Sequence, residues 1–179
     1  MVGESLGAFG GQGAFSDIDD ALAEVDHALW VGTPGFTALR KEAESSREPG
    51  SGQMFPVLGD GSDVIFANDE GDLSGTHPKV VFLQNADDPI AWWDPDLIIE
   101  KPDWIGEPLD PAVNPEISYG PVRTFLQIST DMAVGNSFEE GNGHLYGTLP
   151  ITAWRQMLDS GWSDARVDEL EERMSNLGR

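Results

Sequence analysis

The chain has 179 residues, of which 39% are hydrophobic and 9% aromatic, a composition typical of a globular domain rather than a disordered segment. It contains no cysteine, which excludes disulfides, thiolate metal sites and a cysteine nucleophile. The net charge is −22, from 32 acidic and 10 basic residues, so its surface repels phosphate backbones and nucleic acid is not an expected partner. We expect a single domain over residues 1–179.

Targeting signals are not evident in the chain, and its localisation stays open. No apolar run approaches the ~20 residues that span a bilayer. The N-terminus lacks the basic and apolar stretches of a signal peptide.

The first part of the chain predicts short helices and strands after a glycine-rich start. Residues 16–25 are expected to form a helix with Ser16 as its N-cap. Residues 27–32 indicate a short buried strand, and residues 36–45 a helix. Residues 47–63, rich in glycine and proline, are expected to be a loop.

The middle of the chain carries the strongest strand signal. Residues 64–67 predict a short strand, and residues 79–85 predict a clearer one, because they are β-branched and aromatic between turn residues. Residues 91–120 contain five prolines and cannot form long regular elements. A helix opened by Pro121 is predicted next, with a strand over 122–129 as the competing prediction.

The last part is predicted to be a polar loop followed by two helices. The loop covers residues 136–147, and the helices cover about 150–159 and 163–176, with Ser163 capping the second. Strands that alternate with helices indicate an α/β fold around a short parallel sheet.

One short motif near the start points to chemistry. Gly3-Glu4-Ser5-Leu6-Gly7 has the Gly-x-Ser-x-Gly pattern of a nucleophile elbow, in which serine sits on a strained turn between a strand and a helix. A serine in an unstructured glycine-rich segment is the competing interpretation of Ser5.

The order of the other candidates favours a catalytic triad. In α/β-hydrolases the chain order is Ser, then Asp or Glu, then His. Ser5 is followed by the 79–85 strand, which runs into Asp88, and then by His144 in a glycine-flanked loop. An acid just beyond a parallel strand lies on the rim where such sheets place their sites.

Each residue then has an expected role. His144 would take the proton of Ser5, and Asp88 would hold the imidazole and stabilise the imidazolium. The backbone N–H of Leu6 would be one oxyanion donor. Asp87 is a live alternative to Asp88 as the acid.

The remaining candidates have plainer interpretations. His27 is expected to be structural and His77 to be a surface loop residue. Trp92 and Trp93 are expected to pack, with an apolar wall for an acyl group as the alternative. Three scattered histidines without cysteine indicate no metal site, and no cofactor is expected.

Several blocks resemble an actinobacterial-type α/β-hydrolase family whose members carry a multi-span membrane segment ahead of the catalytic domain. The block Leu83–Leu97 contains Asp88-Pro89-Ile90-Ala91-Trp92-Trp93, a pattern far more specific than the elbow. The others are Gly3–Gly10, Leu29–Phe36, Pro102–Trp104, Gly120–Val122 and Gly141–Gly147. The resemblance implies the C-terminal half of a three-layer α/β-hydrolase domain, acting on acyl or lipid-like esters through Ser5, Asp88 and His144.

The chain departs from that family in lacking the membrane segment and the first half of the domain. Little more than Met1 and Val2 precedes the elbow, so we expect a truncated chain whose partner in the parent protein is the missing half. Three hypotheses follow: a serine hydrolase of small-molecule esters, a non-catalytic remnant or interaction module, and an acyltransferase.

Overall fold

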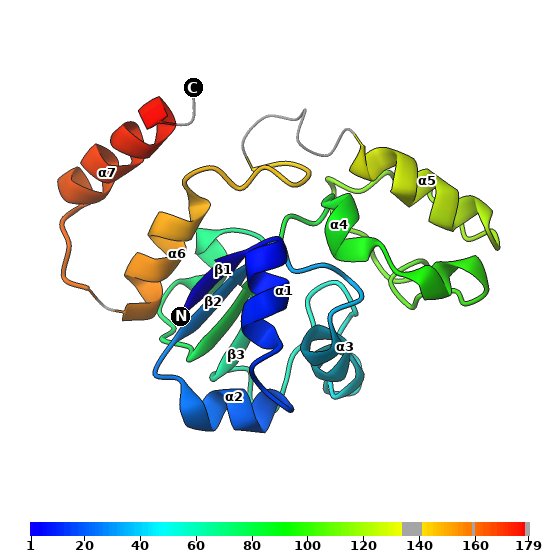
Figure 1. Ribbon diagram of the computed structural model, residues 1–179, viewed down its shortest axis with the longest axis horizontal. Helices are drawn as coiled ribbons and strands as arrows, with labels where there is room; N and C mark the ends of the chain where they lie inside the picture. Colours follow the sequence, from blue (N-terminus) through cyan, green and yellow to red (C-terminus); the bar gives the residue numbers. More distant parts are fainter. Residues whose placement is uncertain (134–140, 159, 178–179) are drawn as a thin grey trace.

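The computed structural model describes residues 1–133, 141–158 and 160–177. In that part the strands form one parallel sheet, in the order β1-β2-β4-β3 (Figure 1). The strands are β1 (Val2–Glu4), β2 (Ala28–Val31), β3 (Val64–Ala67) and β4 (Val80–Leu83). The helices are α1 (Leu6–Gln12), α2 (Ile18–Glu24), α3 (Ala38–Ser45), η1 (Glu70–Leu73), α4 (Pro89–Trp92), η2 (Pro95–Ile98), α5 (Arg123–Met132), α6 (Leu149–Leu158) and α7 (Asp164–Leu177).

The two central strands, β2 and β4, are buried along their whole length. Their sequences, Ala-Leu-Trp-Val and Val-Val-Phe-Leu, are continuous apolar runs, which is the pattern of a parallel strand covered on both faces. Trp30 and Phe82 point to one face, where their rings lie 5.1 Å apart. The predicted strands are confirmed, and with them the α/β class.

Helices cover both faces of the sheet, so the molecule has three layers (Figure 1). On one face, α1, α2 and α3 pack residues such as Ala8, Ala21 and Leu39 against Trp30 and Phe82. On the other face, η1 and α6 form a second core with the strand residues that point away from the first core. The members of that second core include Leu29, Val31, Val81, Leu83, Leu73, Ala153 and Met157.

A third apolar cluster lies beyond the sheet and is built from the segment after β4. It joins α4, η2 and α5 through buried residues that include Ala91, Trp92, Leu97, Trp104 and Ile128. The proline-rich segment is therefore packed although its regular elements are short.

Some element boundaries differ from the predictions. The N-cap of α2 is Asp17 rather than Ser16, because the Asp17 carboxylate accepts the backbone N–H of Asp20. The helix prediction after residue 120 is right and the competing strand is wrong, but α5 begins at Arg123, so Pro121 precedes it. The predicted 136–147 loop falls partly outside the described residues; its described part, 141–147, consists of turns and an isolated bridge.

The glycine-rich start is regular rather than unstructured. It forms β1 and α1, for which no bounds were predicted. Strand β1 lies at one end of the sheet order and, among the described residues, pairs with β2 alone. No helix in the described ranges combines the length and the apolar character that a membrane crossing demands.

Candidate functional site

Ser5 occupies the turn between β1 and α1 with a backbone of φ 53° and ψ −117°. Positive φ is rare for residues other than glycine and costs on the order of 1–3 kcal/mol, so the surrounding structure must hold it. Two hydrogen bonds do so: the Ser5 N–H donates to Val31 O at 2.9 Å, and the Phe9 N–H donates to Ser5 O at 3.0 Å. This is the strained strand-to-helix turn that the motif predicts.

The two glycines of the motif are not equivalent. A Cβ on Gly3 would lie 2.5 Å from the backbone oxygen of Gly7 and 2.8 Å from the nitrogen of Ala8, so α1 can fold back over β1 only if residue 3 lacks a side chain. A Cβ on Gly7 would meet nothing within 4 Å. The turn therefore requires a glycine at position 3 but has room for a side chain at position 7.

Asp88 lies beyond the carboxyl end of β4 as the N-cap of α4, with Pro89 at the first turn. Its side chain is fully buried, and its Oδ1 accepts the Ile90 N–H at 2.8 Å. An aspartate before proline suits this place, because the residue before proline favours an extended backbone and the carboxylate caps the short helix.

His144 lies in the turn-rich segment 141–147 and is buried against the end of β4. Its Nδ1 is 2.8 Å from Asp88 Oδ2, so the carboxylate fixes the tautomer with the proton on Nδ1. Burial by itself would lower the pKa of His144, but the hydrogen bond and charge of Asp88, with the charge of Glu4, outweigh it and raise the pKa above 6.5.

A glycine after β2 leaves room for the imidazole. Gly32 has φ 56°, and a Cβ there would lie 2.7 Å from His144 Cε1 and 3.1 Å from Nδ1. Gly32 directly follows Val31, whose oxygen accepts the Ser5 N–H. The backbone at the end of β2 therefore contacts both the Ser5 turn and the His144 ring.

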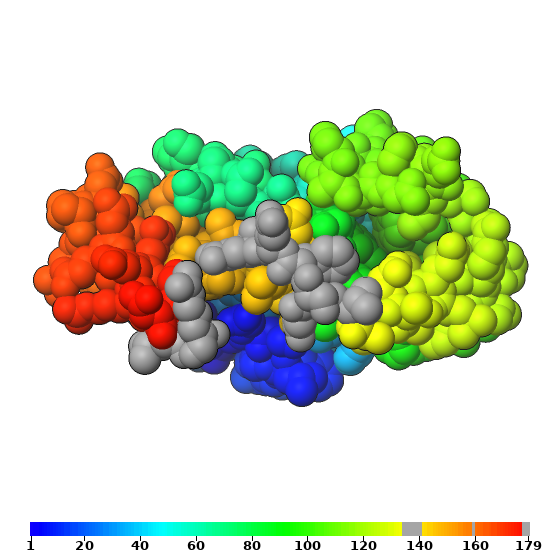
Figure 2. Space-filling view, turned by 90° about the horizontal axis from the view of Figure 1, so that it is seen from above, coloured from blue at the N-terminus to red at the C-terminus, as the bar shows by residue number. Residues whose placement is uncertain are grey.

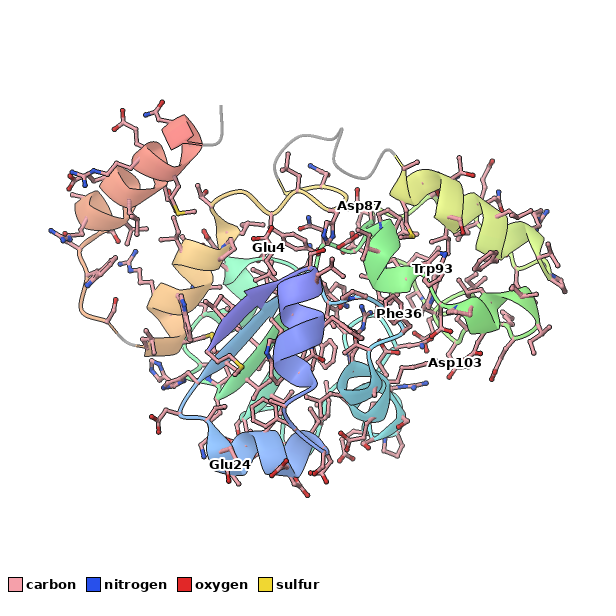
Figure 3. All side chains as sticks on the ribbon, in the orientation of Figure 1. Glu4, Glu24, Phe36, Asp87, Trp93 and Asp103 are labelled. Atoms are coloured by element: carbon pink, nitrogen blue, oxygen red, sulfur yellow. The ribbon has the colours of Figure 1, made fainter. Side chains whose placement is uncertain are left out.

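The three candidates share one rim but do not form a closed chain of hydrogen bonds. Among the described residues, the buried Nε2 of His144 has no hydrogen-bond partner, so Ser5 Oγ is not bonded to it here. Glu4, next to Ser5, is close enough to act on the charge of His144, and Glu4 and Asp87 both lie at the upper end of the sheet (Figure 3). Nucleophile–base contacts are often loose before substrate binds, so this geometry is compatible with a triad.

Asp87 and two residues not predicted from the sequence, Asn85 and Tyr146, anchor the His144 loop. The Gly143 N–H donates to Asp87 Oδ1 at 2.9 Å, and Asn85 Nδ2 donates to Gly143 O at 2.9 Å. Tyr146 is fully buried, and its hydroxyl contacts Asp88 Oδ2 at 2.7 Å. Asp88 is therefore the acid bonded to His144, while Asp87 holds the loop. In the sequence, such a network was indicated only by the polar residues that directly follow β4.

Figure 2 shows, from above, where the segment that carries this loop lies. Residues about 141–150, in gold, lie at the centre of that face, between the blue N-terminal segment and the green residues around 70. The hydrogen bonds of Asn85 and Asp88, which follow β4, place the His144 loop beyond the carboxyl end of that strand.

The two tryptophans after Asp88 have different environments. Trp92 is buried, donates from Nε1 to Ala86 O at 2.8 Å, and packs on Trp104 and the Arg40 guanidinium. Trp93 is half-buried and lies beside Phe36, at 5.7 Å between ring centroids (Figure 3). Both tryptophans therefore pack as predicted, Trp92 inside the third apolar cluster and Trp93 at its partly exposed edge, where its Nε1 donates to Ser129 Oγ at 2.8 Å.

Trp93 belongs to a row of four rings that we call the aromatic row: Phe9, Phe36, Trp93 and Phe125. Successive centroids are 5.6, 5.7 and 5.5 Å apart, typical of favourable aromatic pairs. Phe9 and Phe36 are exposed, and Leu6, next to Ser5, is 75% exposed. The row therefore forms an apolar strip that starts on the helix following Ser5.

Comparison with known proteins gives the family of the chain. Residues 1–170 match the model of the alpha/beta-hydrolase family. Neither curated proteins nor solved structures gave a significant match. The match covers β1 to α7 almost completely, and it agrees with the parallel sheet. The chain belongs to the α/β-hydrolase family.

Proposed function

We propose that the protein is a serine hydrolase that cleaves acyl esters, with Ser5 as nucleophile, His144 as base and Asp88 as the acid that orients it. The observation that carries the proposal is the buried 2.8 Å contact between His144 Nδ1 and Asp88 Oδ2, at the rim where Ser5 takes its strained turn. Membership of the α/β-hydrolase family supports it.

The first step is attack by Ser5 Oγ on the ester carbonyl carbon. A serine hydroxyl is a weak nucleophile, so its proton must pass to His144 Nε2 as the C–O bond forms. Because Nδ1–H is directed at Asp88, Nε2 carries the lone pair in the neutral ring. The buried carboxylate then stabilises the imidazolium.

The negative charge that develops on the carbonyl oxygen needs hydrogen-bond donors. Leu6 is the first residue of α1, so its N–H has no acceptor within the helix. We assign this N–H as one oxyanion donor; loss of such a donor typically costs about 10²–10³ in rate. His144 returns its proton to the leaving alcohol, and water then hydrolyses the acyl-enzyme by the same steps in reverse.

The acyl part of the substrate is assigned to the aromatic row. Its rings begin one turn after Ser5 on α1 and continue through Phe36 to Trp93. Exposed apolar surface of this kind favours the apolar chain of an ester over a charged substrate. The net charge of −22 likewise disfavours anionic substrates.

Hydrolysis of short-chain p-nitrophenyl esters tests the proposal. The wild type is compared with Ser5→Ala, and Ser45→Ala, on the exposed side of α3, is the matched control. We expect Ser5→Ala to lose activity by about 10⁴-fold or more and the control to keep it. Equal rates for wild type and Ser5→Ala would instead identify a non-catalytic member of the family.

The acceptor that resolves the acyl-enzyme distinguishes a hydrolase from an acyltransferase. Both share attack by serine and differ in whether water or an alcohol takes the acyl group. Product analysis in the presence of a primary alcohol is expected to give mainly free acid. A predominance of the new ester would make the protein an acyltransferase.

The pH dependence of kcat/KM follows from the same assignment. The base must be neutral, so the rate rises as pH passes upward through the pKa of His144. Because that pKa is raised by Asp88 and Glu4 against the effect of burial, the acid limb is expected above pH 6.5.

A further inference from the structure

Tyr146 places a hydroxyl between the backbone N–H of Asn85 and the acid of the site. Its side chain is fully buried, and its ring meets the His144 ring edge to face, with centroids 5.7 Å apart. Its Oη lies 3.1 Å from the Asn85 nitrogen and 2.7 Å from Asp88 Oδ2. The hydroxyl therefore contacts the same carboxylate oxygen as the imidazole.

The direction of the hydroxyl proton is fixed by these neighbours. Asn85 N–H can only donate, so Tyr146 Oη accepts there and directs its own proton to Asp88 Oδ2. Asp88 Oδ2 thus accepts from both His144 and Tyr146, while Oδ1 accepts from Ile90 N–H. A fully buried carboxylate is held by three donors, and only one of them belongs to the triad.

We propose that Tyr146 is a positioning residue that sets both the orientation and the charge density of Asp88 toward His144. The inference rests on the proposed function in so far as His144 is the base. The hydroxyl keeps Oδ2 facing Nδ1 and takes up part of its negative charge, so the carboxylate holds the imidazolium less tightly than it would alone. Without it, His144 would be protonated over a wider pH range.

Several charged groups surround the pair, and among them the Asp87 carboxylate accepts the N–H of Gly143, next to His144. Asp88 and Glu4 act on His144, and Asp88 and Arg40 act on Tyr146. Burial, followed by the charge of Asp88, raises the pKa of Tyr146 well above 10, so the phenol stays neutral and donates throughout the pH range of an assay. The donor role of Tyr146 is therefore constant while His144 titrates.

Replacement of the hydroxyl alone tests the proposal. NMR titration of the His144 ring in Tyr146→Phe is expected to give a pKa higher than in the wild type by about half a unit or more, because hydrogen bonds to charged groups are strong. The acid limb of kcat/KM should move by the same amount, with kcat reduced and KM unchanged. An unchanged or lowered pKa of His144 in folded Tyr146→Phe would overturn the proposal.

The other tyrosine of the chain supplies the control. Tyr119 has a buried hydroxyl without a hydrogen-bond partner among the described residues, so Tyr119→Phe removes the same atom and should leave the pKa of His144 unchanged. A shift of equal size in Tyr119→Phe would make the effect non-specific and contradict the proposal.

A second replacement keeps the hydroxyl and the fold while it changes the strength of the donor. 3-Fluorotyrosine at position 146 is a stronger donor than tyrosine, so the pKa of His144 should fall, opposite to Tyr146→Phe. A rise in that pKa would refute the proposed role. Both titrations need no catalysis, so a shifted pKa without ester hydrolysis would refute the proposed function and leave the role of Tyr146 standing.

Discussion

The two halves of the candidate site are held in different ways. The acid–base half is buried and fixed by many hydrogen bonds, from Tyr146, Ile90 N–H and the Asn85–Gly143 pair. The nucleophile half stands on β1, whose three residues pair with β2 alone among the described residues. Ser5 keeps its strained turn through the close approach of α1 to Gly3 and through two backbone hydrogen bonds, with Val31 and Phe9.

The base is thus oriented by a buried hydrogen-bond network, whereas the nucleophile is positioned by a strained turn. In the buried network, loss of one donor should alter Asp88 and the pKa of His144 more than it alters the fold, because other donors remain. The Ser5 turn has few supports, so a small change in β1 or α1 should act on activity and stability together. The following predictions test that contrast, beginning with the largest effect.

Apart from loss of Ser5 itself, replacement of the acid should have the largest effect. Asp88→Asn keeps the shape but lets the imidazole adopt the wrong tautomer, so kcat is expected to fall on the order of 10⁴-fold. Steady-state ester hydrolysis measures the loss. Asp87→Asn is the control, because its remaining oxygen can still accept the Gly143 N–H, and it should lose less than about tenfold. The reverse order of the two losses would make Asp87 the acid.

A methyl group on Gly3 should damage the nucleophile half selectively. In Gly3→Ala the new Cβ meets backbone atoms at 2.5–2.8 Å, so α1 must shift, with a cost of about 1–3 kcal/mol and a loss of activity of 10-fold or more. Urea denaturation and ester hydrolysis measure the two effects. The titration of His144 should change little, because Asp88, which bonds to its Nδ1, follows β4, and β1 contributes only the charge of Glu4.

Gly7→Ala is the matched control with the opposite sign. The added Cβ meets nothing, and alanine in a helix is favoured over glycine by about 0.5–1 kcal/mol, so stability should stay the same or rise. If the two variants lost stability equally, the contact between α1 and β1 would not be what supports the Ser5 turn.

The smallest effect is expected at the aromatic row. Trp93→Ala should lower kcat/KM for an octanoyl ester about tenfold and change it little for an acetyl ester, because only the longer chain reaches the row. Trp162→Ala, an exposed tryptophan before α7, is the control. Equal losses for both esters would remove the row from substrate binding.

Much of the sheet could be predicted from the sequence because its central strands are buried on both faces. The apolar runs of β2 and β4 were enough to predict where these strands lie in the sequence. Asp88 could be placed on the rim because it follows β4 closely. Ser5 was indicated by glycine spacing, and Gly3 has the steric reason that the spacing implied.

What could not be predicted depends on contacts between distant segments. Tyr146 is one aromatic residue among polar turn residues, and only the fold brings its hydroxyl to Asp88, 58 positions away. The different environments of Trp92 and Trp93 likewise depend on Arg40 and Trp104 beneath one ring and on Phe36 beside the other. The N-cap of α2 is Asp17 and not the predicted Ser16. Serine and aspartate can both cap a helix, and here the Asp17 carboxylate accepts a backbone N–H of the first turn.

The most direct test of the central claim is covalent labelling with a fluorophosphonate, followed by peptide mass spectrometry. The reagent reacts with a serine that an adjacent base activates, so the proposed function predicts one adduct on Ser5, abolished in Ser5→Ala and strongly slowed in Asp88→Asn. Labelling of another serine, or a Ser5 that stays unmodified in the folded wild-type protein, would contradict the assignment of Ser5, Asp88 and His144 as a working triad.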